Sequence, residues 1–305
     1  VGASISNQSY WAKTGNYNAQ VEQMYQDLQG VKENRYYVTP EMYGAVGDGL
    51  TDDTDALQEA INAGKVVALM EGKTYRCTKA IRLASDLVIS GNGAKLIFET
   101  ITTFIDQSVI YGYQLENVTI ENLFIDFGSQ GSDKWGLSTL DSANVTLSGC
   151  NFKGQGEDAN HFTYRCNNSN HITVRDCIFD GMLGGVYFQN SKNMLFCDCK
   201  FKNTYGHSIY MDSSDAIGSF DITVSNILCE NTGASHTNGS AIVVYGNTHD
   251  VNINNVYCRN CKAGLQISYH GSYTKVPYNV TVSNYNIDSA TQNGINITGL
   301  TTKYI

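Results

Sequence analysis

Hydrophobic and polar positions alternate in one short pattern that recurs seven times between residues 117 and 288. In most copies an apolar residue, a polar residue and a second apolar residue follow one another, which is the period of a strand with one buried face. Successive copies begin 22 to 29 residues apart, about the length of one turn of a coil of short strands. The copies read NVTIENLFID, NVTLSGCNFK, HITVRDCIFD, NMLFCDCKFK, DITVSNILCE, DVNINNVYCR and NVTVSNYNID. The pattern therefore predicts a β-solenoid.

A sharp turn and a second short strand are expected inside each copy. The sixth position holds residue types that tolerate the left-handed conformation: Asn122, Gly149, Asp176, Asp198, Asn226, Asn255 and Asn284. The apolar positions that follow are expected to point inward. Cys150, Cys177 and Cys199 should form one buried stack of reduced thiols, because small apolar side chains pack well there.

The last position of each copy alternates in charge through all seven copies. Opposite charges on neighbouring strands attract and like charges repel, so this column favours one strand register over slipped ones. The column has a structural explanation, which counts against a catalytic role for its carboxylates. Its members are Asp126, Lys153, Asp180, Lys202, Glu230, Arg259 and Asp288.

The first part of the chain is organised differently. Apolar residues recur there at alternating spacings of four and three, which is typical of a short coiled coil: Tyr17, Val21, Met24, Leu28 and Val31. Residues 1–37 are therefore predicted to be a helical neck that joins three identical chains, and the alternative is an amphipathic helix lying on its own domain. Residues 38–305 are predicted to form the solenoid, with a capping helix at about 53–62 because an open solenoid end exposes core and unpaired backbone.

Composition narrows the possible functions. The 305 residues carry a net charge of −9, which argues against nucleic acid as a partner. No run approaches the 18 apolar residues of a membrane span, so no membrane partner is expected. The nine cysteines fall mostly at inward positions, which favours assembly in a reducing cytosol. Turn and helix-cap roles explain Asp48, Asp52, Asp53 and Asp55 better than a calcium site does, and we expect neither metal nor cofactor.

Two segments carry a resemblance to known proteins. The run YGAVGDGLTDDTDALQEAI at 43–61, with GKTYR at 72–76, resembles the opening of the pectate-lyase-like superfamily, which includes polygalacturonases and many phage tailspikes. The run NQSYWAKTGNYNAQVEQ at 7–23 is similar to segments that precede such domains in phage tail and preneck appendage proteins. The resemblance implies a right-handed parallel β-helix, in agreement with the usual chirality of parallel crossovers. It also implies a place in the virion tail, after assembly in the host cytoplasm.

The chain departs from the polygalacturonases of that superfamily at their catalytic motifs. Those enzymes carry NTD, then GDD one coil later, then GHG one coil after that. Gly206-His207-Ser208 resembles the last motif, but Met182-Leu183-Gly184-Gly185 stands where the paired aspartates would be expected. The hydrolytic carboxylates of that family are therefore missing from their usual places, and any activity must be built differently.

A candidate site comes from aligning the third strand of each coil. Two outward columns result, Arg165, Tyr187, Tyr210 and Asn167, Gln189, Asp212. Together they predict a flat polar and aromatic patch, suited to stacking sugar faces and to bonding hydroxyls or carboxylates. Glu157, Asp158 and His161 in one loop and His207 in another should lie at its rim.

These residues define the predicted roles. Glu157, Asp158 and Asp212 are acid/base candidates, with His207 or His161 as a partner. Arg165 is the predicted anchor for an anionic sugar, Tyr187 and Tyr210 are the stacking platform, and Gln189 bonds substrate. The function that fits best is a homotrimeric phage tailspike or appendage. It binds, and cleaves, a bacterial surface polysaccharide, and its N-terminus contacts other virion tail proteins. The alternatives are a non-catalytic receptor-binding or structural shaft, and a free-standing bacterial polysaccharide lyase or glycoside hydrolase.

Overall fold

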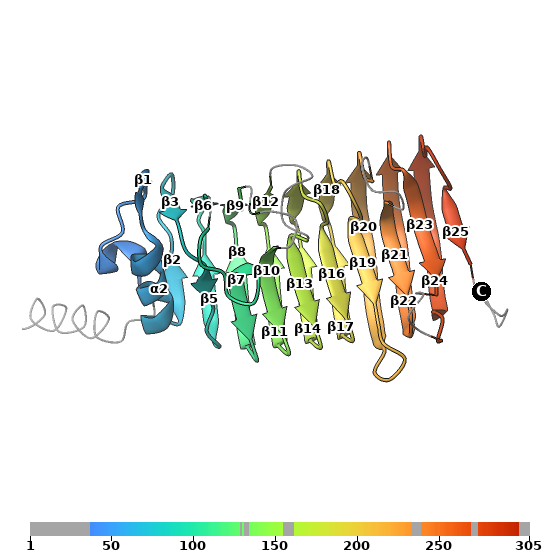
Figure 1. The fold of residues 1–305 in the computed structure, drawn as a ribbon, viewed down its shortest axis with the longest axis horizontal. Coiled ribbons are helices and arrows are strands. Elements are labelled where there is room, and N and C mark those ends of the chain that lie inside the picture. Colours follow the sequence, from blue (N-terminus) through green and yellow to red (C-terminus); the bar gives the residue numbers. More distant parts are fainter. Residues whose placement is uncertain are drawn as a thin grey trace, which may run out of the picture.

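The computed structural model describes residues 37–99, 101–128, 130, 134–154, 162–233, 239–269 and 274–298. The protein is mostly β, a parallel β-solenoid of about eight turns with one short α-helix. Figure 1 shows the strands side by side along the long axis, from β1 beside the helix at one end to β25 at the other. The predicted neck, residues 1–37, lies outside the described residues apart from Tyr37, and the right-handed sense of the coil stays a prediction.

Three rows of strands form the walls of the solenoid, and every pairing between named strands is parallel. The first row is β2 (Val66–Ala68), β5 (Leu87–Ser90), β8 (Glu116–Glu121), β11 (Ala143–Ser148), β14 (Asn170–Arg175) and β17 (Lys192–Cys197). The second row is β1 (Asp48–Asp52), β3 (Thr74–Cys77), β6 (Lys95–Phe98), β9 (Phe124–Asp126), β12 (Asn151–Lys153), β15 (Ile178–Asp180) and β18 (Lys200–Lys202). Three longer strands continue through both rows: β20 (Ser219–Glu230), β22 (Thr248–Arg259) and β24 (Tyr278–Asp288).

The remaining row is called the third sheet below. It has nine strands in one order along the solenoid. They are β4 (Ile81–Arg82), β7 (Ser108–Tyr113), β10 (Trp135–Leu140), β13 (Tyr164–Asn167), β16 (Val186–Gln189), β19 (Ile209–Asp212), β21 (Ser240–Tyr245), β23 (Ala263–Ser268) and β25 (Ile295–Ile297).

The core consists of side chains stacked in columns along the solenoid. Phe152, Phe179 and Phe201 are register partners, and their ring centres lie 4.9 and 4.7 Å apart. The predicted stack of Cys150, Cys177 and Cys199 is confirmed, because all three are buried beside that column. All nine cysteines are free thiols, as the sequence predicts.

The turn column is also confirmed. All seven predicted residues have a positive φ, from 49° at Asn284 to 63° at Gly149. The side-chain amide of Asn226 donates to Asp198 Oδ1 at 2.9 Å, and its own oxygen accepts from Asn255 at 2.7 Å. A second left-handed column, at the first residue of each copy, was not predicted. It contains Asn117, Asn144, His171, Asn193, Asp221, Asp250 and Asn279.

The charged column (Asp126, Lys153, Asp180, Lys202, Glu230, Arg259 and Asp288) has the expected register. Lys153 pairs with Asp126 on one side and with Asp180 on the other, and Glu230 pairs with Lys202 and Arg259. Lys153 Nζ lies 3.2 Å from Asp126, and Arg259 lies 3.1 Å from Glu230. These contacts support the register role and give the carboxylates a partner.

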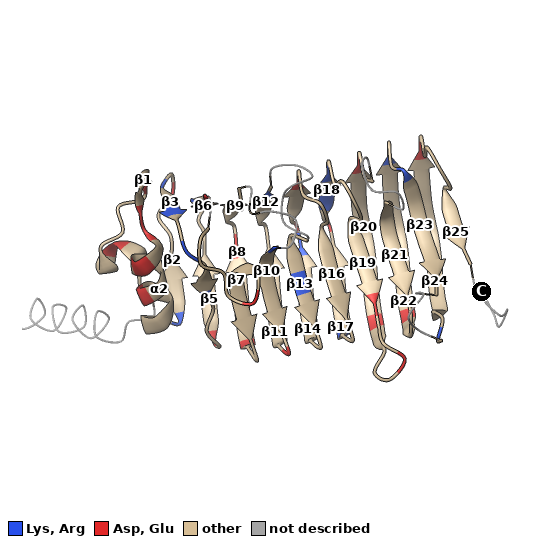
Figure 2. Cartoon of the chain, viewed as in Figure 1, with Lys and Arg blue, Asp and Glu red and all other residues tan. Residues whose placement is uncertain are grey.

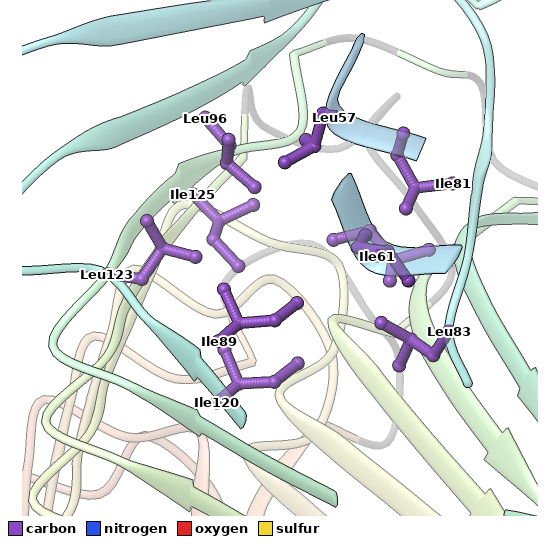
Figure 3. A pocket seen from close by; sticks show the side chains of 10 residues that line it. Leu57, Ile61, Ile81, Leu83, Ile89, Leu96, Ile120, Leu123 and Ile125 are labelled. Carbon is purple, nitrogen blue, oxygen red and sulfur yellow. The ribbon is translucent and has the colours of Figure 1, made fainter. Parts of the chain in front are cut away.

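One end of the solenoid is closed by α2 (Thr54–Ala63), which follows the short 3-10 helix η1 (Pro40–Tyr43). Leu57, Ala60 and Ile61 of α2 are buried against the first coils. Figure 3 shows Leu57 and Ile61 pointing into a small apolar cavity of about 10 Å³. The acidic residues before the helix accept hydrogen bonds from the backbone of the loop that leads into it. Asp53, buried, accepts from the backbone N–H of Val46 at 2.7 Å, and Asp48 accepts from Thr51 at 2.8 Å.

Candidate functional site

The outward columns of the third sheet lie in the predicted register. Arg165 pairs with Tyr187, and Tyr187 pairs with Tyr210. In the second column Gln189 pairs with Asn167 on one side and with Asp212 on the other. The strand alternation produces this arrangement, because Val186 and Phe188 on the same strand point into the core and are fully buried.

Aromatic rings form a continuous series across five neighbouring strands of this sheet, called the aromatic run below. Its members are Trp135, Phe162, Tyr187, Tyr210 and Tyr245. The ring centres of Trp135 and Tyr187 lie 5.7 Å apart, those of Tyr187 and Tyr210 5.4 Å, and those of Tyr210 and Tyr245 5.4 Å. Phe162 lies 5.5 Å from Tyr187. All except Phe162 are partly exposed, so the run presents aromatic surface over several coils.

A tight glycine turn lies under the middle of the run. A Cβ on Gly184 would lie 2.3 Å from the Phe162 ring, and one on Gly185 would lie 2.2 Å from the carbonyl oxygen of Ser208. Two glycines are therefore required for the close approach of these coils. This is the place where the resemblance to polygalacturonases would put paired aspartates, and the packing leaves no room for them.

Asp212 ends β19 beside the run. Only 4% of the residue is exposed, its Oδ1 accepts the backbone N–H of Ser213 at 2.8 Å, and its Oδ2 accepts from Gln189 Nε2 at 3.3 Å. Burial, reinforced by the negative charge of Asp212, raises the pKa of Tyr245. Tyr245 therefore stays protonated near neutral pH and keeps its hydroxyl as a hydrogen-bond donor.

His207 lies in the turn before β19 and is also buried, with 8% of the residue exposed. Its ring centre is 5.1 Å from that of Tyr210, and its Nδ1 accepts the backbone N–H of Ser240 at 3.1 Å. An Nδ1 that accepts a hydrogen bond carries no proton, so the hydrogen of the neutral ring is on Nε2. The neutral ring can therefore act as a hydrogen-bond donor through Nε2.

The Arg165 guanidinium is held from three directions. It forms an ion pair with Asp106 and donates from Nε to Ser138 Oγ at 3.1 Å. Its Cζ lies 4.5 Å from the centre of the Trp135 ring, within the range of a cation–π interaction. Only 13% of the side chain is exposed. Arg165 can therefore serve as the predicted anchor for an anionic sugar only if its pair with Asp106 opens.

The structure brings together most of the predicted residues that it describes. Arg165, Tyr187, Gln189, Tyr210 and Asp212 occupy adjacent strands, and His207 contacts Tyr210. The other three candidates, Glu157, Asp158 and His161, lie outside the described residues. The side-chain oxygen of Asn167 is buried beside Gln189 with no hydrogen-bond partner among the described residues.

Four residues of this region were missed by the sequence analysis. Tyr245 could have been found, because it continues the column of Asn167, Gln189 and Asp212 by one coil. Trp135 and Phe162 occupy equivalent positions of neighbouring coils, three residues before Ser138 and Arg165, so the repeat could have placed them together. Asp106 is distant in sequence from Arg165, and no periodic signal marks it.

The site offers stacking surface, hydrogen-bonding amides, one buried carboxylate at Asp212 and a histidine that contacts Tyr210. Such a combination suits a polar ligand with flat apolar faces, which describes a sugar ring. The described part of the chain contains no group of three or more metal-ligating side chains. None of its helices is long and apolar enough to cross a membrane.

Two proteins to which the chain is similar in sequence come from bacteriophages. The chain is 25% identical over 295 residues to the pre-neck appendage protein of Bacillus phage B103, covering 90% of this chain and 31% of that protein. It is 32% identical over 200 residues to the capsule K30/K69-specific depolymerase of Klebsiella phage K64-1, covering 61% of this chain and 24% of that protein. The chain thus spans a third or less of the length of either relative.

The fold has counterparts among solved structures. The tailspike protein of E. coli bacteriophage HK620, solved in complex with a hexasaccharide, matches with a TM-score of 0.57 and 16% identity, covering 85% of this chain and 52% of that chain. At this identity the likeness concerns the fold alone. The family model described as rhamnogalacturonase A/epimerase, pectate lyase-like, matches residues 40–229. The chain therefore belongs to this pectate lyase-like family.

Proposed function

We propose that this chain is the β-helical part of a phage tail appendage that binds and cleaves a bacterial surface polysaccharide along the third sheet. The observation that supports this most is the aromatic run, which passes over five strands, contacts His207 through Tyr210 and lies beside Asp212 at the end of β19. The relatedness to phage appendage and capsule depolymerase proteins adds a location in the virion tail. We further propose a right-handed coil and a homotrimer joined through residues 1–37, which also contact other tail proteins.

The proposed binding mode uses the run as a floor. Sugar faces stack on Tyr187 and Tyr210, while Gln189 bonds hydroxyl groups. Several sugar units are contacted at once, because the rings follow the solenoid axis over several coils. A long polymer gains more from this arrangement than a single sugar does.

The proposed chemistry places an acid/base role on Asp212. His207, in the turn before the same strand, is a hydrogen-bond donor, and Glu157, Asp158 and His161 of the segment 155–161 are the candidates for the second acid/base group. Glycosidic cleavage by paired carboxylates and elimination beside a uronate both use groups of these types.

Asp212→Asn tests the catalytic part. The Asn side chain keeps an oxygen for the Ser213 N–H, so the fold should survive, while the general acid or base is lost. We expect polysaccharide cleavage to fall by about 100-fold or more. Cleavage is followed by new reducing ends and by the ultraviolet absorbance of unsaturated uronates, on capsules and cell-wall glycans from a panel of bacteria.

Asp141→Asn is the matched control, because Asp141 is an exposed turn residue with a positive φ that Asn tolerates. Full activity in Asp212→Asn would contradict the assigned role. Glu157→Gln and Asp158→Asn test the loop in the same way.

A non-catalytic receptor-binding shaft is the second candidate. It is favoured by the glycine turn at Gly184 and Gly185, which occupies the place of the paired aspartates of the related hydrolases. In that case polysaccharide binds and Tyr210→Ala weakens binding, but no polysaccharide of the panel is cleaved.

A further inference from the structure

Positive charge is scarce along the aromatic run. Arg165 is the only Lys or Arg in the strands of the third sheet from β10 to β23. The internal segments that the structure leaves undescribed contain no Lys or Arg either, and the segment 155–161 contains Glu157 and Asp158. In Figure 2 this face is mostly tan, with blue on β13 and red toward the end of β19.

Two nearby cations are engaged beyond the N-terminal end of the run. Lys134 donates to the side-chain oxygen of Gln107 and lies 4.9 Å from the centre of the Phe104 ring. Arg82, on β4, lies 5.4 Å from the centre of the Tyr111 ring. Neither stands on the strands that carry the aromatic rings, and Lys262, in the turn before β23 beyond the other end, is also engaged.

The one cation within the run is neutralised by a built-in carboxylate. Asp106 pairs with Arg165 from 59 residues away, in a turn where Asp106 and Gln107 both have a positive φ. Ser108 Oγ lies 2.7 Å from Ser138 Oγ, which also receives the Arg165 Nε–H. The turn is thus fixed against the sheet by several contacts, and the charge of Arg165 is balanced within the protein.

We infer that the aromatic run takes an uncharged stretch of glycan, one that carries hydroxyl or acetamido groups and no uronate, sialate or phosphate at the contacted sugars. This inference rests on the proposed function and, of its two reactions, selects glycosidic hydrolysis, because elimination needs a uronate at the cleaved sugar. An anionic sugar here would face Asp106 and Asp212 without a free cation to pair with, and unpaired like charges at an interface disfavour binding. Stacking and hydrogen bonding to neutral sugars need no such cation.

The test uses an array of bacterial surface polysaccharides grouped into neutral and acidic repeat units. The wild-type chain should bind neutral members, and its affinity should change little with added NaCl because few ionic contacts form. Asp106→Asn leaves the Arg165 charge unbalanced while keeping a residue that tolerates a positive φ. This variant should gain about 10-fold in affinity for acidic members, the scale of one hydrogen bond to a charged group.

Two controls separate the effect from a general change in charge. Asp221→Asn makes the same change at an exposed residue of β20 that also has a positive φ, and this variant should bind as wild type does. The double variant Asp106→Asn, Arg165→Gln should lose the gain for acidic glycans, which assigns that gain to Arg165.

The outcomes are distinguishable. Tight, salt-sensitive binding of acidic glycans by the wild type would overturn the inference and leave the proposed function standing. So would an Asp106→Asn variant that behaves like Asp221→Asn. If no polysaccharide of either class is bound or cleaved by the wild type, the proposed function fails, and this inference fails with it.

Discussion

The aromatic run and the charged column are both outward surfaces of the same coil, but the strand register explains only one of them. In the charged column each residue faces opposite charges on the adjacent coils, as Lys153 does between Asp126 and Asp180. The aromatic run crosses five strands, four of its five rings are partly exposed, and all five members lie outside the repeated motif.

The difference shows how a function can be sought on a repetitive fold. A surface column that recurs in every coil is explained by the stacking of coils. A surface that is specific to five coils is not required by the repeat, so it is the better place to look for a ligand. The same comparison separates the carboxylates, because Asp180 belongs to the recurring column and Asp212 does not.

The largest expected effect comes from the core that supports both surfaces. Phe179→Ala removes a buried ring stacked 4.9 Å from Phe152 and 4.7 Å from Phe201, and should lower the free energy of unfolding by about 3–5 kcal/mol. This loss is measured by denaturant titration with circular dichroism as the signal, and Phe179→Leu is the milder control. A loss below about 1 kcal/mol would show that the stacked core does not hold adjacent coils together as we describe.

Two tyrosines sharpen the comparison directly, one on each outward surface. Tyr210→Ala removes a ring that contacts Tyr187, Tyr245 and His207, and should weaken polysaccharide binding by about 100-fold, the scale of an interface hot spot. Tyr257→Ala, near the charged column beneath Arg259, should leave binding unchanged. Isothermal titration calorimetry of each variant, with a polysaccharide that the wild type binds, measures both effects. Equal losses in both variants would end the distinction between the two surfaces.

The turn column should show a purely structural effect. Asn226→Ala places an ordinary residue at φ 55° and removes two ladder hydrogen bonds, so stability should fall by about 2 kcal/mol. Asn226→Gly should recover part of this loss, because glycine adopts the conformation without strain. Binding should be unchanged in both. An Ala variant as stable as the Gly variant would show that backbone strain plays no part.

The smallest effect is expected in the charged column. Lys202→Glu puts a negative charge between Asp180 and Glu230, and should lower stability by about 0.5–1 kcal/mol, less at high salt. Lys202→Gln is the control that removes the attraction without adding repulsion. If Lys202→Glu leaves the free energy of unfolding unchanged at low salt, the electrostatic explanation of the register is wrong.

The repeated sequence pattern was sufficient to predict a β-solenoid and its core positions. Val145, Leu147 and Phe152 could be assigned to the core because strand alternation and stacking turn a repeated pattern into columns with few alternatives. The same periodicity predicted the left-handed turns and the outward direction of Tyr187, Tyr210 and Asp212.

The tertiary structure alone decided how the site is assembled. Asp106 and Arg165 are 59 residues apart and meet only because a turn before β7 folds onto the third sheet. Trp135 and Phe162 occupy equivalent positions of neighbouring coils, but only their packing against Tyr187 shows that they join the run. Periodic sequence specifies what each coil repeats. The non-repeating turns between strands, whose contacts are long-range, decide what differs from coil to coil, and the site is formed from those differences.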